Sequence, residues 1–173
     1  SEMIINLEDS KAVLVSYHSD DPNVGMSLSQ DISKYKLFVS DTGLFVTMVF
    51  WDKDFTENTI YQKLLADKLE ANLGYIYENL TAQMLTAAGN KLFYFTFEKD
   101  EKHSYEVDFL LSRGNKICPI EVKSSGYKSH ASLDAFRAKY SARIKNSYLL
   151  YTKDFKIGDN ELMYVPFYMT GML

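Results

Sequence analysis

The sequence feature that most constrains the fold is the pair Gly114-Asn115, which lies between two apolar segments. Gly-Asn is a two-residue turn signal typical of β-hairpins. We therefore predict one strand over residues 105–111, a second over residues 116–123, and a tight connection between them. A two-residue loop fixes the register of a hairpin, so the position of each side chain along both strands follows from it.

The predicted register brings acidic side chains together. It places Asp108 directly opposite Glu121, and Glu106 opposite Lys123. Side chains alternate across a strand, so these four residues share one face of the hairpin. Directly opposed like charges destabilise an antiparallel pair, unless a cation lies between them. Asp108 and Glu121 are therefore candidate ligands for Mg²⁺ or Mn²⁺, which prefer carboxylate oxygens and water.

The rest of the hairpin leaves two interpretations open. The same alternation puts Val107 and Phe109 together on the opposite, apolar face. Lys123, one pleat from the paired acids, would polarise a water or offset charge on a scissile phosphate. Alternatively, the polar face is simply solvated, and Glu106 and Lys123 form an ordinary cross-strand ion pair. A bulge that shifts the register by one residue would exclude the metal site.

Composition limits the other classes of function. The chain has 173 residues, of which 46% are hydrophobic, so it is long enough for one domain with a core. A single cysteine, Cys118, excludes an internal disulfide and a thiolate zinc site. The net charge of −4 argues against a dominant phosphate-binding surface, although basic residues gather in residues 123–145. There is no apolar run of about 20 residues and no signal pattern, which predicts a cytoplasmic protein.

The periodicity of apolar residues predicts an α/β fold with a mixed central sheet flanked by helices. A helical pattern covers residues 56–88, with a break near residues 72–74 and an end at Gly89. Asp41 has the character of a helix cap or turn residue. We predict further strands at residues 11–17, 36–39, 92–97, 147–152 and 162–167, and a helix at 130–144. We expect residues 1–55 to be the tail of a preceding domain, and residues 56–173 to form the main domain.

One further acid enters through a resemblance. Taken alone, Glu78 is a polar position of a helical segment and more typical of an exposed site. However, Glu78 on a helix, Val107-Asp108 on a strand and Glu121-Val122-Lys123 on the next strand are similar to the PD-(D/E)xK restriction-endonuclease-like motif set, in the same order. The resemblance implies that Glu78, Asp108 and Glu121 are metal ligands or their supports, and that Lys123 is the lysine of the motif.

A narrower resemblance covers residues 74–151 and 36–44. These segments look like an uncharacterised C-terminal domain attached to bacterial and archaeal AAA-type P-loop ATPases. The present chain has no Gly-x-x-x-x-Gly-Lys-Ser/Thr loop, so we expect ATP to be bound by an upstream ATPase domain of a longer protein and not by this fragment. The implied function is Mg²⁺- or Mn²⁺-dependent hydrolysis of DNA phosphodiesters. The rival is a catalytically silent binding or regulatory module that docks onto the ATPase.

Overall fold

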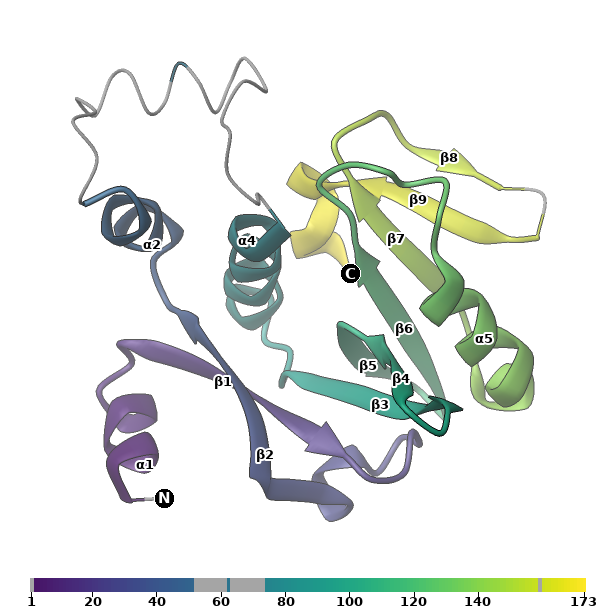
Figure 1. Ribbon diagram of the computed structural model, residues 1–173, viewed down its shortest axis with the longest axis horizontal. Coiled ribbons are helices and arrows are strands. Elements are labelled where there is room, and N and C mark those ends of the chain that lie inside the picture. The colour runs from purple at the N-terminus through teal and green to yellow at the C-terminus, as the bar shows by residue number, and fades with distance from the viewer. Residues whose placement is uncertain (1, 52–61, 63–73, 159) are drawn as a thin grey trace.

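The chain forms a mixed α/β structure, seen in a computed structural model that describes residues 2–51, 62, 74–158 and 160–173 (Figure 1). Among these residues the α-helices are α1 (Glu2–Asp9), α2 (Thr42–Val49), α4 (Gly74–Ala87) and α5 (Ala131–Tyr140), with 3-10 turns at η1 (Met26–Leu28), η2 (Ser141–Arg143) and η3 (Phe167–Met172). The strands are β1 (Val13–Ser19), β2 (Gln30–Val39), β3 (Phe93–Asp100), β4 (His103–Val107), β5 (Phe109–Arg113), β6 (Lys116–Val122), β7 (Ser147–Tyr151), β8 (Lys156–Ile157) and β9 (Leu162–Pro166).

The strands are divided between two sheets. One has the order β2-β1-β3-β4 and the other has the order β5-β6-β7-β9-β8. Each sheet mixes orientations: β1 runs parallel to β3, and β7 runs parallel to both β6 and β9, while the remaining pairs are antiparallel. The predicted α/β class with mixed strand directions is confirmed, and the strands make two sheets where one central sheet was expected.

The division between the sheets falls at Asp108. The strand predicted over residues 105–111 is broken by a bend at this residue, so that β4 pairs with β3 and β5 pairs with β6. The bend also changes which side chains share a face. Val107 packs in the same apolar cluster as Leu110, whereas Phe109 packs in the cluster that contains Ile120. The prediction that Val107 and Phe109 point to the same side is therefore wrong.

The hairpin register itself is confirmed. Pairs run from Phe109 with Ile120 to Arg113 with Lys116, and Gly114 adopts a φ of +67° in the turn. This is the register that the Gly-Asn turn predicts. The ladder ends before Asp108, however, so the predicted opposition of Asp108 and Glu121 lies just beyond the last hydrogen-bonded pair.

Strand β6 is an internal strand of the larger sheet, between β5 and β7, and helices cover both of its faces. Ala82 and Leu85 of α4 pack in the cluster that contains Ile120 and Leu150. Phe136 of α5 packs in the cluster on the other side, with Ile117 and Leu110. Figure 1 shows α4 and α5 on opposite sides of β6 and β7. A charged residue in the middle of such a strand is consequently removed from water.

The remaining elements largely follow the sequence. The strands near residues 11–17 and 36–39 are present as β1 and the much longer β2, and Asp41 caps α2 by accepting a hydrogen bond from the Leu44 N–H at 3.0 Å. Gly89 follows α4 with a φ of +84°, as its predicted end requires. The helix expected at 130–144 is shorter and finishes in η2. The helix expected at 56–73 and its break lie outside the described residues, apart from residue 62.

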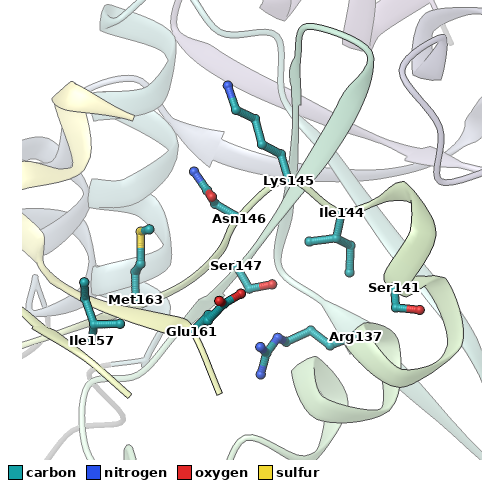
Figure 2. A pocket seen from close by; sticks show the side chains of 9 residues that line it. All are labelled: Arg137, Ser141, Ile144, Lys145, Asn146, Ser147, Ile157, Glu161 and Met163. Atoms are coloured by element: carbon teal, nitrogen blue, oxygen red, sulfur yellow. The ribbon is translucent and has the colours of Figure 1, made fainter. Parts of the chain in front are cut away.

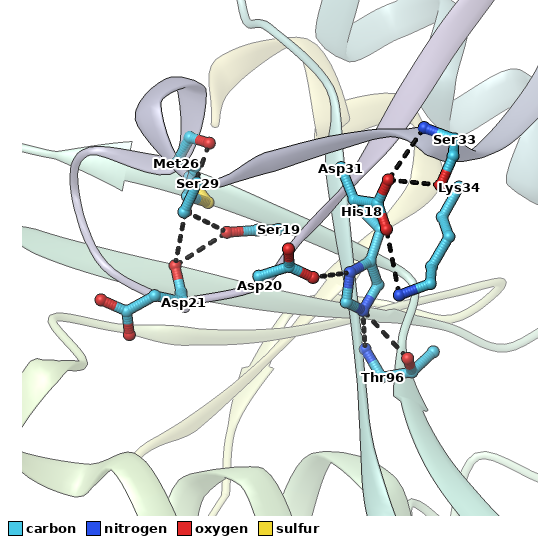
Figure 3. A network of polar contacts seen from close by, with 10 residues as sticks. All are labelled: His18, Ser19, Asp20, Asp21, Met26, Ser29, Asp31, Ser33, Lys34 and Thr96. Carbon is cyan, nitrogen blue, oxygen red and sulfur yellow. Dashed lines mark hydrogen bonds and ion pairs between the residues drawn. The ribbon is translucent and has the colours of Figure 1, made fainter.

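A polar network fastens the N-terminal strands to the rest of the fold (Figure 3). The ring of His18, on β1, lies 3.1 Å from Asp20 through Nδ1, and its Nε2 lies 2.9 Å from the Thr96 hydroxyl on β3. Nε2 also accepts a hydrogen bond from the Thr96 N–H. Because His18 is buried, these bonds fix β1, and with it β2, beside β3. The boundary that we predict at residue 56 stays a prediction.

In the described part of the chain, no helix has both the length and the apolar character that crossing a membrane requires.

Replacement of Gly114 by alanine tests the turn that sets the register. An L-residue in the left-handed region is strained, and a Cβ at this position would touch nothing, so strain alone should decide the result. We expect Gly114→Ala to lower the free energy of unfolding by about 1 kcal/mol. Gly25→Ala is the control, since Gly25 has a φ of −86° and room for a Cβ. Urea unfolding measures both, and equal effects would contradict the assignment.

Candidate metal-binding site

The four residues singled out in the sequence gather where the two sheets meet. Glu121 lies near the end of β6 and Lys123 follows that strand. Asp108 occupies the bend between β4 and β5, and Glu78 lies on α4. The negative charges of Glu121 and Glu78 both act on the carboxyl group of Asp108. The structure therefore brings together the three acids, although they come from a helix, a bend and a strand.

Glu121 is the most buried of these acids, with 5% of its surface exposed. Its Oε1 atom lies 2.8 Å from the Lys123 Nζ atom. Its Oε2 atom is buried and has no hydrogen-bond partner among the described residues. A buried carboxylate oxygen without a partner is costly, so a cation or a water molecule at this atom would stabilise the site.

Asp108 ties the two strands together at the bend. Its Oδ2 atom accepts a hydrogen bond of 2.7 Å from the Val122 N–H, which lies beyond the last hairpin pair. Burial of the carboxyl group raises the pKa of Asp108 well above its ordinary value, and repulsion from Glu121 and Glu78 raises it further. The pKa of Glu78 is also raised, first by burial. Two neighbouring acids thus resist ionisation together, as closely spaced carboxylates do.

The cluster also contains a second lysine, which was not predicted from the sequence. Lys36 of β2 places its Nζ atom 2.5 Å from Glu106 Oε1 and 3.8 Å from Glu78 Oε2. Glu106 therefore pairs with Lys36, and its predicted position opposite Lys123 is wrong, because β4 pairs with β3 and Glu106 faces Thr96 there. The one sequence signal was the position of Lys36 in a predicted strand, and nothing in the sequence connects that strand with Glu106.

The donor set agrees with a hard divalent cation held by few protein ligands. Among the described residues, no group of three or more His, Cys, Asp and Glu side chains is arranged to hold a metal ion. Mg²⁺ commonly takes only one or two carboxylates and completes its shell with water and phosphate. The unpartnered oxygen of Glu121 and the neighbouring carboxyl of Asp108 supply that number, and Glu78 is a third acid near them.

A hollow of about 590 Å³ lies at the other end of β7 (Figure 2). It opens between α5, η2 and β9, and Ser147 marks the start of β7 at its wall. Figure 2 shows Arg137 and Glu161 among its lining side chains. Glu78, Asp108, Glu121 and Lys123 do not line this hollow, so it is separate from the acidic cluster.

Fold and site together define a mixed α/β domain with a buried acidic cluster at the junction of two sheets. Residues 73–169, more than half of the chain, match the family described as a domain of unknown function, DUF4143, and the chain belongs to this family. A comparison with curated proteins finds no match. A comparison with solved structures finds none either.

Replacement of Asp108 by asparagine tests the electrostatics of the cluster. Folding raises the pKa of Asp108, so its contribution to stability is full below its ordinary value of 3.8 and is lost as the pH rises through the raised value. We expect metal-free Asp108→Asn to be more stable than the parent by about 1 kcal/mol at pH 8, with the gain shrinking toward pH 4.

Thermal melting in a chelator, measured at several pH values, checks this expectation. The asparagine side chain keeps an oxygen that can accept the Val122 N–H bond. Asp154→Asn is the matched control, because Asp154 is exposed. A loss of stability in Asp108→Asn at pH 8 would mean that Lys36 and the backbone already compensate the charge.

Proposed function

We propose that this chain is a divalent-metal-dependent nuclease-like domain of the PD-(D/E)xK type, which hydrolyses phosphodiester bonds in DNA. The observation that carries the proposal is the buried, unpartnered Oε2 atom of Glu121 beside Asp108 and Lys123. Acid, acid and lysine are the residue types that the motif requires, and they lie together at the end of β6. Glu78 of α4 supplies the fourth element of the motif.

Each residue has a role that follows from its position. Asp108 and Glu121 would hold the ion, and Glu78 would support them or orient a water molecule. A bound Mg²⁺ or Mn²⁺ supplies a Lewis acid that lowers the pKa of water and offsets phosphate charge. The ammonium group of Lys123 has three N–H donors, of which the contact with Glu121 uses one. Lys123 can therefore also donate to a phosphate oxygen as negative charge develops there.

Positive and aromatic side chains near the site support a nucleic-acid substrate. Tyr127 follows Lys123 by four residues, and the Nζ atoms of Lys153 and Lys156 lie 5.0 and 5.2 Å from the centre of its ring. Both lysines are exposed. Lysines that meet phosphate and rings that stack on bases are the means by which proteins hold single strands. Because the net charge of the chain is −4, binding of DNA would require a local positive surface of this kind.

A second candidate function, a catalytically silent binding or regulatory module, has an observation of its own. Lys123 pairs with Glu121, and Lys36 pairs with Glu106 and Glu78, so much of the acidic charge is balanced by the chain itself. A cluster neutralised in this way can serve stability alone. The two functions differ in whether the domain cleaves phosphodiester bonds.

The proposal extends to the longer protein. The resemblance to C-terminal domains of AAA-type P-loop ATPases supports a tether to an upstream ATP-binding domain, with the pair acting in the cytoplasm. In this arrangement the ATPase would control when or where the nuclease-like domain meets DNA, and ATP would bind to the upstream domain.

Metal binding is the first test of the proposed function. Titration calorimetry should detect Mn²⁺ binding to the chain, and Glu121→Gln should weaken it at least about tenfold, because one of few charged ligands is lost. Glu98→Gln is the matched control, since Glu98 is exposed at the far end of β3. Equal affinities for the parent and for Glu121→Gln would remove Glu121 from the metal site.

Cleavage is the second test. With Mg²⁺ or Mn²⁺, the purified chain should nick plasmid or cut single-stranded DNA, and Lys123→Ala should lose about 10²–10³ in rate. Melting curves should accompany the assay, because loss of folding would mimic loss of catalysis. Lys116→Ala is the control, because Lys116 lies at the turn where β6 begins, at the opposite end of the strand from Lys123. Cleavage that survives in Lys123→Ala would indicate a contaminating nuclease, whereas metal binding without cleavage would favour the silent module.

A further inference from the structure

We propose that Lys36 is a resident counter-ion of the acidic cluster, and that its positive charge opposes the binding of a divalent cation to Asp108. The inference rests on the proposed metal site, but it concerns a residue outside the motif. Lys36 lies on β2, whereas the family match covers residues 73–169. Lys36 therefore brings a positive charge into the site from a strand that lies outside the residues matching the family.

The contacts of Lys36 hold its ammonium group among the acids. The Nζ atom bridges Glu106 and Glu78, at 2.5 and 3.8 Å. The same atom lies 5.3 Å from the centre of the Tyr94 ring, and Tyr94 is buried. Only 22% of the Lys36 side chain is exposed. A long side chain confined in this way is held in place, unlike the usual mobile surface lysine.

The backbone explains why the lysine arrives at this point. Lys36 pairs with Ser16 across β1 and β2, and β1 runs beside β3. The His18 ring fixes β1 to Thr96, the residue that faces Glu106 in the β3–β4 ladder. Lys36 and Glu106 are thus carried by the two edge strands of one sheet, with β1 and β3 between them. Their contact is built into the sheet and does not depend on a flexible loop.

The charges at this point oppose the binding of a divalent cation. Burial lowers the pKa of Lys36, but attraction to Asp108, Glu106 and Glu78 outweighs it, and the pKa is raised. Lys36 therefore stays charged at neutral pH. One positive charge among three carboxylates stabilises the metal-free cluster. A divalent cation held by Asp108 would meet that charge at short range, so its affinity is lower than the acids alone would give.

This role differs from a purely structural one in a measurable way. If Lys36 only stabilises the fold, its removal lowers the melting temperature and leaves metal affinity unchanged. If Lys36 opposes binding of the cation, its removal lowers the melting temperature of the metal-free chain and strengthens Mn²⁺ binding. The stability lost without metal should then return in excess Mn²⁺, because the ion takes over the neutralisation.

The test compares Mn²⁺ affinities by titration calorimetry. Lys36→Met should bind Mn²⁺ more tightly than the parent, by on the order of tenfold, because a like charge is removed. Lys36→Arg keeps the charge and should retain the parent affinity. Lys34→Met is the matched control, since Lys34 lies on the same strand but pairs with Asp31 in an exposed position. Lys36→Gln, which can still hydrogen-bond to Glu106, replaces Lys36→Met if that variant does not fold.

The outcomes separate this inference from the proposed function. Equal Mn²⁺ affinity in the parent, Lys36→Met and Lys36→Gln, with binding still lost in Glu121→Gln, would overturn the role of Lys36 and leave the metal site standing. Weaker binding in Lys36→Gln would also overturn it, because Lys36 would then assist the ion. Absence of binding in the parent and in every Lys36 variant would overturn both the role of Lys36 and the metal site.

Discussion

The hydrogen bond between the Val122 N–H and the Asp108 carboxylate lies at the point on which the architecture depends. At Asp108 the chain leaves one sheet and enters the other, and the bond holds the bend against the end of β6. A backbone N–H next to a strand end needs a partner, and here an acid supplies it. The same acid is thereby fixed beside Glu121. The break between the sheets and the acidic cluster therefore meet at one contact.

The local parts of this structure could be predicted from the sequence, because they depend on short-range rules. Gly114-Asn115 defines the turn, and the pairing of Phe109 with Ile120 follows from it. Asp41 and Gly89 similarly mark a helix start and a helix end. The bend at Asp108 could not be predicted, because no glycine or proline marks it. The chain changes its strand partner there, from β3 to β6, while the alternation of apolar residues continues through the bend in the sequence.

Some parts of the candidate site could likewise be predicted from the sequence, and others could not. The proximity of Asp108 to Glu121 could be predicted from the sequence, because both residues lie close to the open end of one hairpin. Glu78 entered through a resemblance to known motifs, because a polar residue on a helix gives no sign of what it faces. Lys36 was missed because its partners are set by tertiary structure: Glu106 lies in a strand that no local rule pairs with β2. The periodicity of apolar residues along a sequence does not determine which distant strands come into contact.

The pairing of Lys36 with Glu106 spans 70 residues of chain. Contacts of such long range form late, because the chain must close a large loop before it gains the interaction. Until then Glu78, Asp108 and Glu106 have no Lys36 nearby, and their mutual repulsion opposes compaction at neutral pH. The β2 segment precedes all three acids in the chain, but Lys36 reaches them only when β2 pairs with β1 and β1 pairs with β3. Neutralisation of the acids therefore accompanies the assembly of this sheet.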